Sequence, residues 1–229
     1  MPSFHPGPDP NFPRLEETDF FPFANPKEWK DDIIAVGGNL SPGMLLSAYE
    51  QGIFPWYNPG DPVIWQSPDP RCVIFPDKLH ISSSMRKILN NRTFDVTFDE
   101  DFEGVIRGCS EKERPGQNGT WISEDIIEAY TELHRLGWAH SAEAWQDGEL
   151  AGGCYGVLMG RAFFGESMFA RRSNASKAAF LSLAEKLFES GLAFIDCQVI
   201  TKHLQSLGGE ELSRKDFLAL LEKNRISRY

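Results

Sequence analysis

The pattern of apolar segments and turn residues predicts a series of antiparallel strands in the middle of the chain. Residues 139–146, 150–159 and 162–169 are three such segments, and residues 93–98 alternate between polar and apolar positions. Asp147-Gly148, a dipeptide typical of two-residue hairpin turns, separates the first two segments, and Gly160-Arg161 separates the second from the third. The pattern therefore predicts a three-stranded meander. Two shorter strands are expected before it, at 71–75 and 93–98.

Apolar positions three and four residues apart predict helices on both sides of the meander. Ser41-Pro42 offers an N-cap followed by proline at the first helical position, and Gly52 ends that helix. Ser173 or Asn174 caps an amphipathic segment that runs to Glu189, before Gly191. The other helices are expected at 82–90, 100–109, 123–135 and 213–223.

The order of these elements predicts an α+β fold. The apolar run 191–195 after the amphipathic helix predicts one further strand, and Ser67-Pro68-Asp69-Pro70 is the best candidate domain boundary. We therefore expect a small N-terminal domain at 1–69, with an extended Pro- and Phe-rich arm, and a larger domain at 70–229. Three strands, a helix and another strand are also the core order of N-acetyltransferase-type acyltransferases, with a mixed sheet flanked by helices. This analogy of element order does not establish function.

Two acids and an amide stand out inside apolar segments. Asp196 and Gln198 end the last apolar run two residues apart, so a strand would project both to one face and Cys197 to the other. Glu166 lies within another apolar stretch. Burying a carboxylate costs free energy unless the site needs it. Near one pocket these three side chains could orient and deprotonate an amine, although a structural acid satisfied by backbone donors is the alternative.

Composition narrows the class of protein. The net charge of −10 argues against a generally basic nucleic-acid coat protein, and we expect no DNA partner. No apolar run is long enough for a transmembrane helix and no signal peptide is evident, so no membrane association is expected. The four cysteines are widely spaced, which favours a reduced, cytoplasmic protein, and the five histidines lack metal-ligand spacing. We expect neither a metal nor a cofactor.

Several uncommon strings, in order over residues 33–222, resemble the leucyl/phenylalanyl-tRNA–protein transferase family. The central ones surround the acids and the amide. The strings are Val36-Gly37-Gly38-Asn39-Leu40-Ser41-Pro42, Gly52-Ile53-Phe54-Pro55-Trp56, Ser67-Pro68-Asp69-Pro70-Arg71, Gly119-Thr120-Trp121-Ile122, Gly165-Glu166-Ser167-Met168-Phe169, Asp196-Cys197-Gln198 and His203-Leu204-Gln205-Ser206-Leu207-Gly208. One departure is the loop Lys112–Asn118, which is longer than in some members.

The resemblance implies a small N-terminal domain and an acetyltransferase-like catalytic domain. It also implies transfer of Leu or Phe, less readily Met, from aminoacyl-tRNA to the α-amine of proteins starting with Arg or Lys, which marks them for the bacterial N-end rule pathway. By the same resemblance Asp196 and Gln198 lie at the reaction centre. We assign Asp196 to binding and helping deprotonate the amine, Gln198 to alignment, and Glu166 to an acidic subsite for the incoming Arg or Lys.

The resemblance also suggests an apolar pocket for the transferred side chain. Leu and Phe share bulk and apolarity but not shape, so methionine is a natural lining. On one helix face the candidates could equally be plain core. The candidates are Cys154, Phe163, Met168, Phe180, Leu183, Leu187 and Ile195.

Aromatic and basic residues supply candidate tRNA contacts. Trp56 and Trp121, at expected loop or strand ends, could stack on the terminal adenine, and Tyr49 could add to that wall; ordinary core packing is the alternative. Basic residues in two zones could track the acceptor stem, or simply be solvated. They are Arg71, Arg86, Lys87 and Arg92 in one zone, and Arg171, Arg172 and Lys177 in the other.

Two other functions remain open on the sequence alone. An acyl-CoA N-acetyltransferase would fit the element order, but residues 170–176 lack the glycine-rich pyrophosphate loop that such enzymes carry after the central strand. A non-catalytic adaptor for basic N-terminal residues would need the acids but neither Trp56 nor Gln198. A Ser-His-Asp triad from Ser206, His203 and Asp196 is not supported, because the chain has no Gly-x-Ser-x-Gly elbow.

Overall fold

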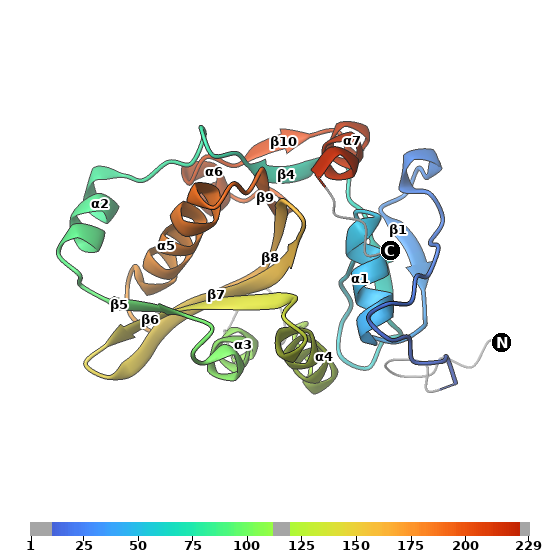
Figure 1. The fold of residues 1–229 in the computed structure, drawn as a ribbon, viewed down its shortest axis with the longest axis horizontal. Coiled ribbons are helices and arrows are strands. Elements are labelled where there is room, and N and C mark those ends of the chain that lie inside the picture. Colours follow the sequence, from blue (N-terminus) through green and yellow to red (C-terminus); the bar gives the residue numbers. More distant parts are fainter. Residues whose placement is uncertain (1–10, 112–119, 225–229) are drawn as a thin grey trace.

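The computed structural model describes residues 11–111 and 120–224 and contains two sheets (Figure 1). The larger sheet has seven strands in the order β10-β4-β9-β8-β7-β6-β5, and only its β8–β9 pair is parallel. Asp147 and Gly148 both have positive φ between β6 and β7, which confirms the predicted hairpin turn. The strands are β4 Arg71–Ile74, β5 Asp95–Phe98, β6 Ala139–Gln146, β7 Glu149–Met159, β8 Ala162–Ala170, β9 Phe194–Gln198 and β10 Glu210–Leu212.

Helices cover both faces of this sheet (Figure 1). On one face, α5 (Ala175–Glu189) and α2 (Ser83–Asn90) enclose an apolar cluster that includes Phe163 and Phe180. On the other face, α3 (Phe102–Ser110) and α4 (Glu124–Arg135) pack over a second cluster. The predicted α+β fold, with a mixed sheet flanked by helices, is confirmed.

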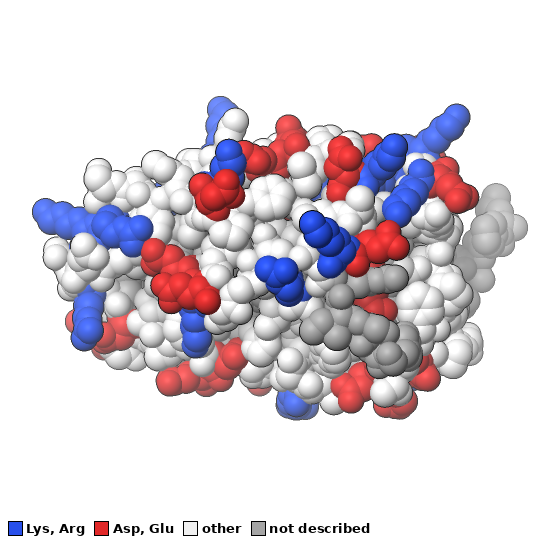
Figure 2. Space-filling view, turned by 45° about the horizontal axis from the view of Figure 1, so that its top comes forward, with Lys and Arg blue, Asp and Glu red and all other residues white. Residues whose placement is uncertain are grey.

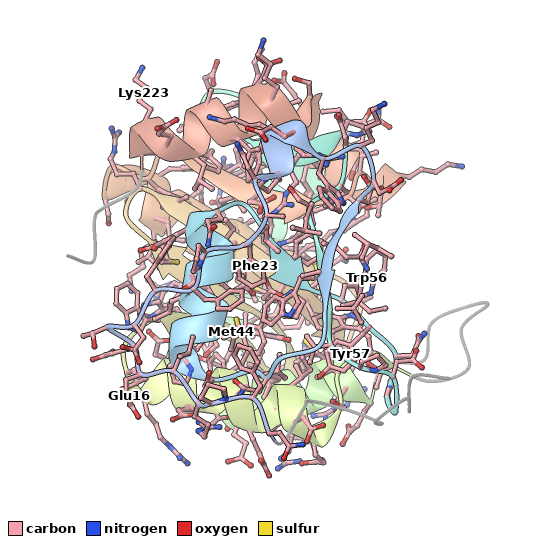
Figure 3. All side chains as sticks on the ribbon, turned by 90° about the vertical axis from the view of Figure 1, so that its right-hand side faces the viewer. Glu16, Phe23, Met44, Trp56, Tyr57 and Lys223 are labelled. Carbon is pink, nitrogen blue, oxygen red and sulfur yellow. The ribbon has the colours of Figure 1, made fainter. Side chains whose placement is uncertain are left out.

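The N-terminal part of the chain forms a smaller unit beside the large sheet (Figure 1), and Figure 3 views the molecule from the side of this unit. Helix α1 is almost entirely buried, and the arm before it packs through Phe12, Phe21 and Phe23, whose rings form edge contacts. The sheet of this unit has the order β1-β3-β2. The elements are η1 Pro26–Glu28, β1 Ile33–Val36, α1 Pro42–Glu50, β2 Phe54–Pro55 and β3 Ile64–Gln66.

The last helix of the chain returns to the N-terminal unit. After α6 (Lys202–Ser206) and β10, α7 (Arg214–Asn224) packs Phe217 and Leu218 against Gly52 so closely that a Cβ there would lie 2.5 Å from the Leu218 side chain. Gly52 also has φ +74°, which disfavours a side chain at this position. One apolar cluster therefore runs from the N-terminal unit into the large sheet.

Candidate active site

An opening in the large sheet forms the centre of the candidate site. The parallel strands β8 and β9 pair only as far as Phe164↔Asp196. Beyond that point β8 stays with β7 and β9 stays with β4, so the two strands separate. Gly165 and Glu166 line one side of the opening and Gln198 lines the other.

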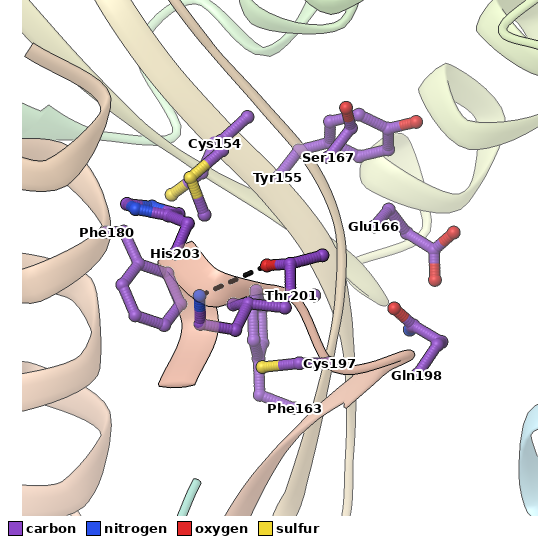
Figure 4. Close-up of a pocket in the computed structure, with 13 residues that line it drawn as sticks. Cys154, Tyr155, Phe163, Glu166, Ser167, Phe180, Cys197, Gln198, Thr201 and His203 are labelled. Carbon is purple, nitrogen blue, oxygen red and sulfur yellow. Dashed lines mark hydrogen bonds between the residues drawn. The ribbon is translucent and has the colours of Figure 1, made fainter. Parts of the chain in front are cut away.

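Two cavities meet at this opening, and Figure 4 shows the residues that line the first of them. The first, about 200 Å³, lies on the α5 side of the sheet, and the second, about 220 Å³, lies toward the N-terminal unit. They share Glu166, Cys197, Gln198, Thr201 and Leu204. The first is also lined by Cys154, Tyr155, Phe163, Gly165, Ser167, Met168, Phe180 and His203, and the second by Phe54, Pro55, Trp56, Trp121 and Val199.

Asp196 lies beneath the opening, fully buried, and lines neither cavity. Its Oδ1 accepts a hydrogen bond from Arg71 Nε at 2.9 Å and its Oδ2 accepts one from Arg71 Nη2 at 2.6 Å. The guanidinium also donates to the Gly52 carbonyl and lies between the rings of Phe54 and Phe217, 4.8 and 4.5 Å from their centroids. Direct contact of Asp196 with an amine, as predicted, is therefore wrong for this structure.

The same pairing corrects the role predicted for Arg71. A guanidinium with no exposed surface and a bidentate carboxylate partner is not placed to bind a tRNA phosphate. Strand β4 carries Arg71 and Val73 on one face and Cys72 and Ile74 on the other, in different apolar clusters. Arg71 therefore points into the protein as the charge partner of Asp196.

Gln198 adopts φ +57° at the end of β9, a conformation that residues other than glycine rarely take. Its backbone N–H donates to Asp196 Oδ1 at 3.0 Å, which holds this turn. Because of the turn, Gln198 does not continue the strand alternation, and its side chain lines both cavities while Asp196 stays buried. The predicted common face for the two side chains is therefore wrong. The buried Nε2 of Gln198 has no hydrogen-bond partner among the described residues.

Glu166 is partly exposed at the point where the cavities meet, and Figure 4 shows its carboxyl group facing the Gln198 amide. Tyr49 donates a hydrogen bond to its Oε1 at 2.7 Å and Tyr130 donates to its Oε2 at 3.3 Å; the two hydroxyl groups also contact each other. Desolvation, with a contribution from the Asp196 charge, raises the pKa of Glu166 to about 7, although the two tyrosines and Arg71 oppose the rise. A carboxyl with this pKa can accept and release a proton near neutral pH.

Tyr49 is fully buried in this hydrogen-bonded group. Burial and the neighbouring Glu166 charge raise the pKa of its hydroxyl well above the ordinary value, so it is a donor here. A side chain without exposed surface cannot stack on a base, and the predicted stacking role of Tyr49 is wrong. Trp56, by contrast, is 39% exposed and lines the second cavity together with the half-buried Trp121.

The predicted apolar pocket is assembled only in part. The structure brings Cys154, Phe163, Met168 and Phe180 together in the lining of the first cavity. Leu183 and Ile195 are buried in the cluster beneath it, and Leu187 packs against that cluster, so these three predictions are wrong because the residues line neither cavity. The sequence analysis did not assign Thr201 and Leu204 to the cavities; the motif string at 203–208 was an available signal for Leu204 only.

Cys197 points into the cluster with Cys72 and Ile195, away from Asp196, as the strand alternation predicts. Its contact with Cys72 and its burial raise the pKa of its thiol well above the ordinary value. A protonated thiol is a poor nucleophile, so Cys197 serves as a cavity wall.

The other basic residues of the two zones lie on the surface. Arg86 pairs with Glu185 across α2 and α5, Arg171 pairs with Glu111, and Arg172 lies 3.8 Å from Glu149. Lys87 is exposed, Lys177 is half-buried, and Arg92 lines a separate pocket beside α2. Figure 2 shows basic and acidic side chains interspersed on the face in view. Gly119 and the Lys112–Asn118 loop lie outside the described residues.

Comparison with known proteins identifies the family. The profile described as "Leucyl/phenylalanyl-tRNA protein transferase" matches residues 73–222, and that of its N-terminal domain matches residues 38–69. A relative from Syntrophobacter fumaroxidans is 52% identical over 92% of this chain and 90% of its own length. One from Flavobacterium johnsoniae is 50% identical over 89% of this chain and 95% of its own length. Both are named leucyl/phenylalanyl-tRNA–protein transferase.

The chain belongs to the leucyl/phenylalanyl-tRNA protein transferase family. As a member it is an aminoacyltransferase, which removes support from the adaptor and acyl-CoA alternatives.

Similarity to solved structures is weaker. L-PGS from Bacillus licheniformis shares 12% identity, with a TM-score of 0.45 over 69% of this chain and 66% of that one. A GCN5-related N-acetyltransferase from Kribbella flavida shares 11% identity, with a TM-score of 0.39 over 76% of this chain and 62% of that one. Among the described residues, no helix is long and apolar enough to cross a membrane, and no group of three or more metal-ligating side chains is present.

Proposed function

We propose that this family member transfers Leu or Phe, and less readily Met, from aminoacyl-tRNA to the α-amine of proteins that begin with Arg or Lys. The product would be marked for degradation by the N-end rule pathway in the cytoplasm. One observation carries the proposal. An apolar cavity and a tryptophan-lined cavity meet at Glu166 and Gln198, which is the arrangement needed to hold an aminoacyl-adenosine by its two ends.

The first cavity suits the transferred side chain. Phe163, Met168 and Phe180 offer apolar walls, and the unbranched thioether of methionine can adapt to either Leu or Phe. Selection by apolar contact alone is modest, roughly 1–3 kcal/mol per methylene. Such a site would discriminate against small or charged amino acids more than between Leu, Phe and Met.

The second cavity suits the terminal adenosine of the tRNA. Trp56 and Trp121 come from segments far apart in sequence and line the same cavity. Stacking of a base on an aromatic side chain contributes roughly 1–3 kcal/mol. Arg86, Lys87, Arg171, Arg172 and Lys177 remain the proposed acceptor-stem contacts. The three arginines would exchange surface acids for phosphates at little cost, since exposed ion pairs contribute about 0–1 kcal/mol.

The ester carbonyl would then lie where the cavities meet. The amine nitrogen attacks the carbonyl carbon, a C–N bond forms, the C–O bond to the ribose breaks, and the ribose oxygen leaves with a proton. A free α-amine has a pKa of roughly 8, so a carboxylate with a pKa of about 7 is a matched acceptor for the proton that the amine must lose.

Gln198 and Asp196 would have different parts in this step. The unpartnered Nε2 of Gln198 can donate to the ester carbonyl as negative charge develops on its oxygen. Asp196 acts as a positioning residue, because it holds the Gln198 backbone and is itself held by Arg71. The negative charge of Glu166 would also attract the acceptor's basic side chain.

The experiment is transfer of labelled Leu or Phe from charged tRNA to a peptide that begins with Arg. We expect transfer to this peptide and not to a matched peptide that begins with Glu. Trp56→Ala should raise KM for aminoacyl-tRNA about tenfold, in line with one lost stacking contact. Gln198→Ala should lower kcat with a smaller effect on KM. Equal transfer to the Glu peptide would contradict the proposed specificity.

A further inference from the structure

The outer face of the small sheet carries a row of exposed and half-buried apolar side chains, of which only Trp56 lines one of the two cavities. Val36 pairs with Ile64 on the neighbouring strand, and the Trp56 N–H donates to the Ile64 carbonyl. Val36 is 61% exposed and Ile33, at the other end of β1, is 46% exposed. We call the row formed by Trp56, Ile64, Val36 and Ile33 the outer strip.

The outer strip begins at the candidate active site. Trp56 lines the second cavity and also stands at the end of the strip. Figure 3 shows Trp56 beside β1. Val199 is also apolar and 42% exposed, and it lines the same cavity. A substrate chain that leaves the cavity past Trp56 would therefore meet apolar surface and not open solvent.

The charges around the outer strip distinguish a polypeptide from a nucleic acid. Asp31 and Asp32 precede β1, and Asp61 lies in the loop that leads to β3. Lys30 and the Arg214–Asp32 pair balance these acids only in part. Phosphates would be repelled here, and the proposed basic tRNA contacts on α2 and at the start of α5 lie toward the opposite end of the molecule from β1 (Figure 1).

We propose that the outer strip binds the segment of the protein substrate that follows its N-terminal Arg or Lys. This inference rests on the proposed function and adds to it a docking surface for the acceptor chain. The proposed occupant is an extended, flexible segment with apolar side chains. Its apolar side chains would contact the row of side chains that crosses the strands, and the flanking acids would favour a polypeptide over a phosphate chain.

Strand geometry sets the length of chain that the strip requires. Neighbouring strands are roughly 4.8 Å apart, so the path from Trp56 on the β2 side across β3 to β1 is about 10 Å. An extended chain advances roughly 3.3 Å per residue, so about three residues beyond the first are needed to cross it. A dipeptide acceptor should therefore not reach Val36, whereas an octapeptide should.

The test measures KM for Arg-starting acceptors of two and eight residues, the longer one with apolar residues at positions three to five. In the unaltered enzyme we expect the octapeptide to have the lower KM. Val36→Lys should raise KM for the octapeptide roughly threefold or more and leave KM for the dipeptide and for aminoacyl-tRNA unchanged. The new cation would repel a basic acceptor and remove apolar contact, and Val36 is too exposed for the change to disturb the core.

Leu136→Lys is the matched control. Leu136 is 42% exposed and follows α4, at the opposite end of that helix from Trp121. It should leave all three KM values unchanged. Equal KM values for the two peptides, or a Val36→Lys effect no larger than that of the control, would overturn the inference while leaving the proposed function intact.

A change in KM for aminoacyl-tRNA in Val36→Lys, without a change for the octapeptide, would assign the outer strip to the tRNA and also overturn the inference. Absence of transfer to either Arg peptide in the unaltered enzyme would instead contradict the proposed function itself. The two failures are therefore distinguishable.

Discussion

The two carboxylates on either side of the opening between β8 and β9 have opposite kinds of surroundings. On the β9 side, Asp196 is fully buried and its charge is matched by the bidentate Arg71. On the β8 side, Glu166 faces the cavities, and hydroxyl groups of Tyr49 and Tyr130 supply its hydrogen bonds, with no salt bridge among the described residues. Neutral donors stabilise a carboxylate less than a cation does, so burial dominates and raises the pKa of Glu166 to about 7.

Because their surroundings differ, Asp196 and Glu166 are suited to different parts, the first structural and the second in proton transfer. Asp196, locked to Arg71, fixes the turn at Gln198 and has no free oxygen at the cavity. Glu166 is only partly exposed at the cavities, and its carboxyl can change its protonation state near neutral pH. We therefore propose that Asp196, the residue that looks most catalytic in sequence, positions Gln198, and that Glu166 accepts the proton.

The largest expected effect comes from breaking the ion pair. Arg71→Met leaves the Asp196 carboxylate buried without a cation and should lower the free energy of unfolding by about 3–5 kcal/mol, measured by urea denaturation. Adding Asp196→Asn to this variant should recover part of the loss, because the uncompensated charge is gone.

Arg86→Met is the control for that change. Arg86 also pairs with an acid, Glu185, but both side chains are exposed. Its removal should change the free energy of unfolding by less than about 1 kcal/mol. Similar losses in the two variants would show that burial of the Arg71 pair is not what makes it important.

A smaller effect, opposite in sign at neutral pH, is expected on the other side of the opening. Because the pKa of Glu166 rises from about 4.5 to about 7 on folding, the folded state binds the proton more tightly than the unfolded state. The wild-type protein should therefore lose stability as pH rises from about 4.5 to about 7. Glu166→Gln, which mimics the protonated form, should be more stable than wild type by about 1–3 kcal/mol at pH 8, discounted for the exposed face of the carboxyl.

The same variant should show little of this gain near pH 4.5, where wild-type Glu166 is protonated in the folded state and about half protonated in the unfolded state. Thermal or urea unfolding of both proteins at the two pH values measures the difference. A stability gain of equal size at both pH values would show that the effect comes from packing and not from ionisation of Glu166.

The smallest expected effects come from the tyrosines. Removing either hydroxyl takes away a donor that favours the ionised carboxylate, so both Tyr49→Phe and Tyr130→Phe should raise the pKa of Glu166 further. Tyr49→Phe should have the larger effect, because its bond is shorter, 2.7 against 3.3 Å, and each hydrogen bond contributes about 0.5–1.5 kcal/mol. Titration of the Glu166 carboxyl measures both, and Tyr57→Phe, at a buried tyrosine outside this group, is the matched control.

Local patterns were sufficient to predict most elements of the large sheet and its helices. The turn at Asp147-Gly148 between two apolar-rich segments needs no distant partner, and the strand 139–146 is observed as predicted. The short strands β1, β2, β3 and β10 were not predicted, because segments of two to four residues carry too little periodicity and depend on their partners.

The site was harder to predict because its chemistry depends on contacts between distant residues. Arg71 resembles a surface cation in sequence, and only its contact with Asp196, 125 residues later, shows that it is buried. Tyr49 likewise meets Glu166 across 117 residues. Strand alternation predicted the direction of Cys197 correctly but failed at Gln198, where the backbone turns to positive φ.

The central claim is that Glu166 changes its protonation state near neutral pH. Carbon-13 NMR of protein labelled at glutamate carboxyl groups tests it directly, with Glu166→Gln to assign the signal. We predict one carboxyl resonance that titrates with a midpoint near pH 7 and is missing from the variant. A Glu166 resonance that titrates below about pH 5, like an ordinary exposed glutamate, would contradict the account.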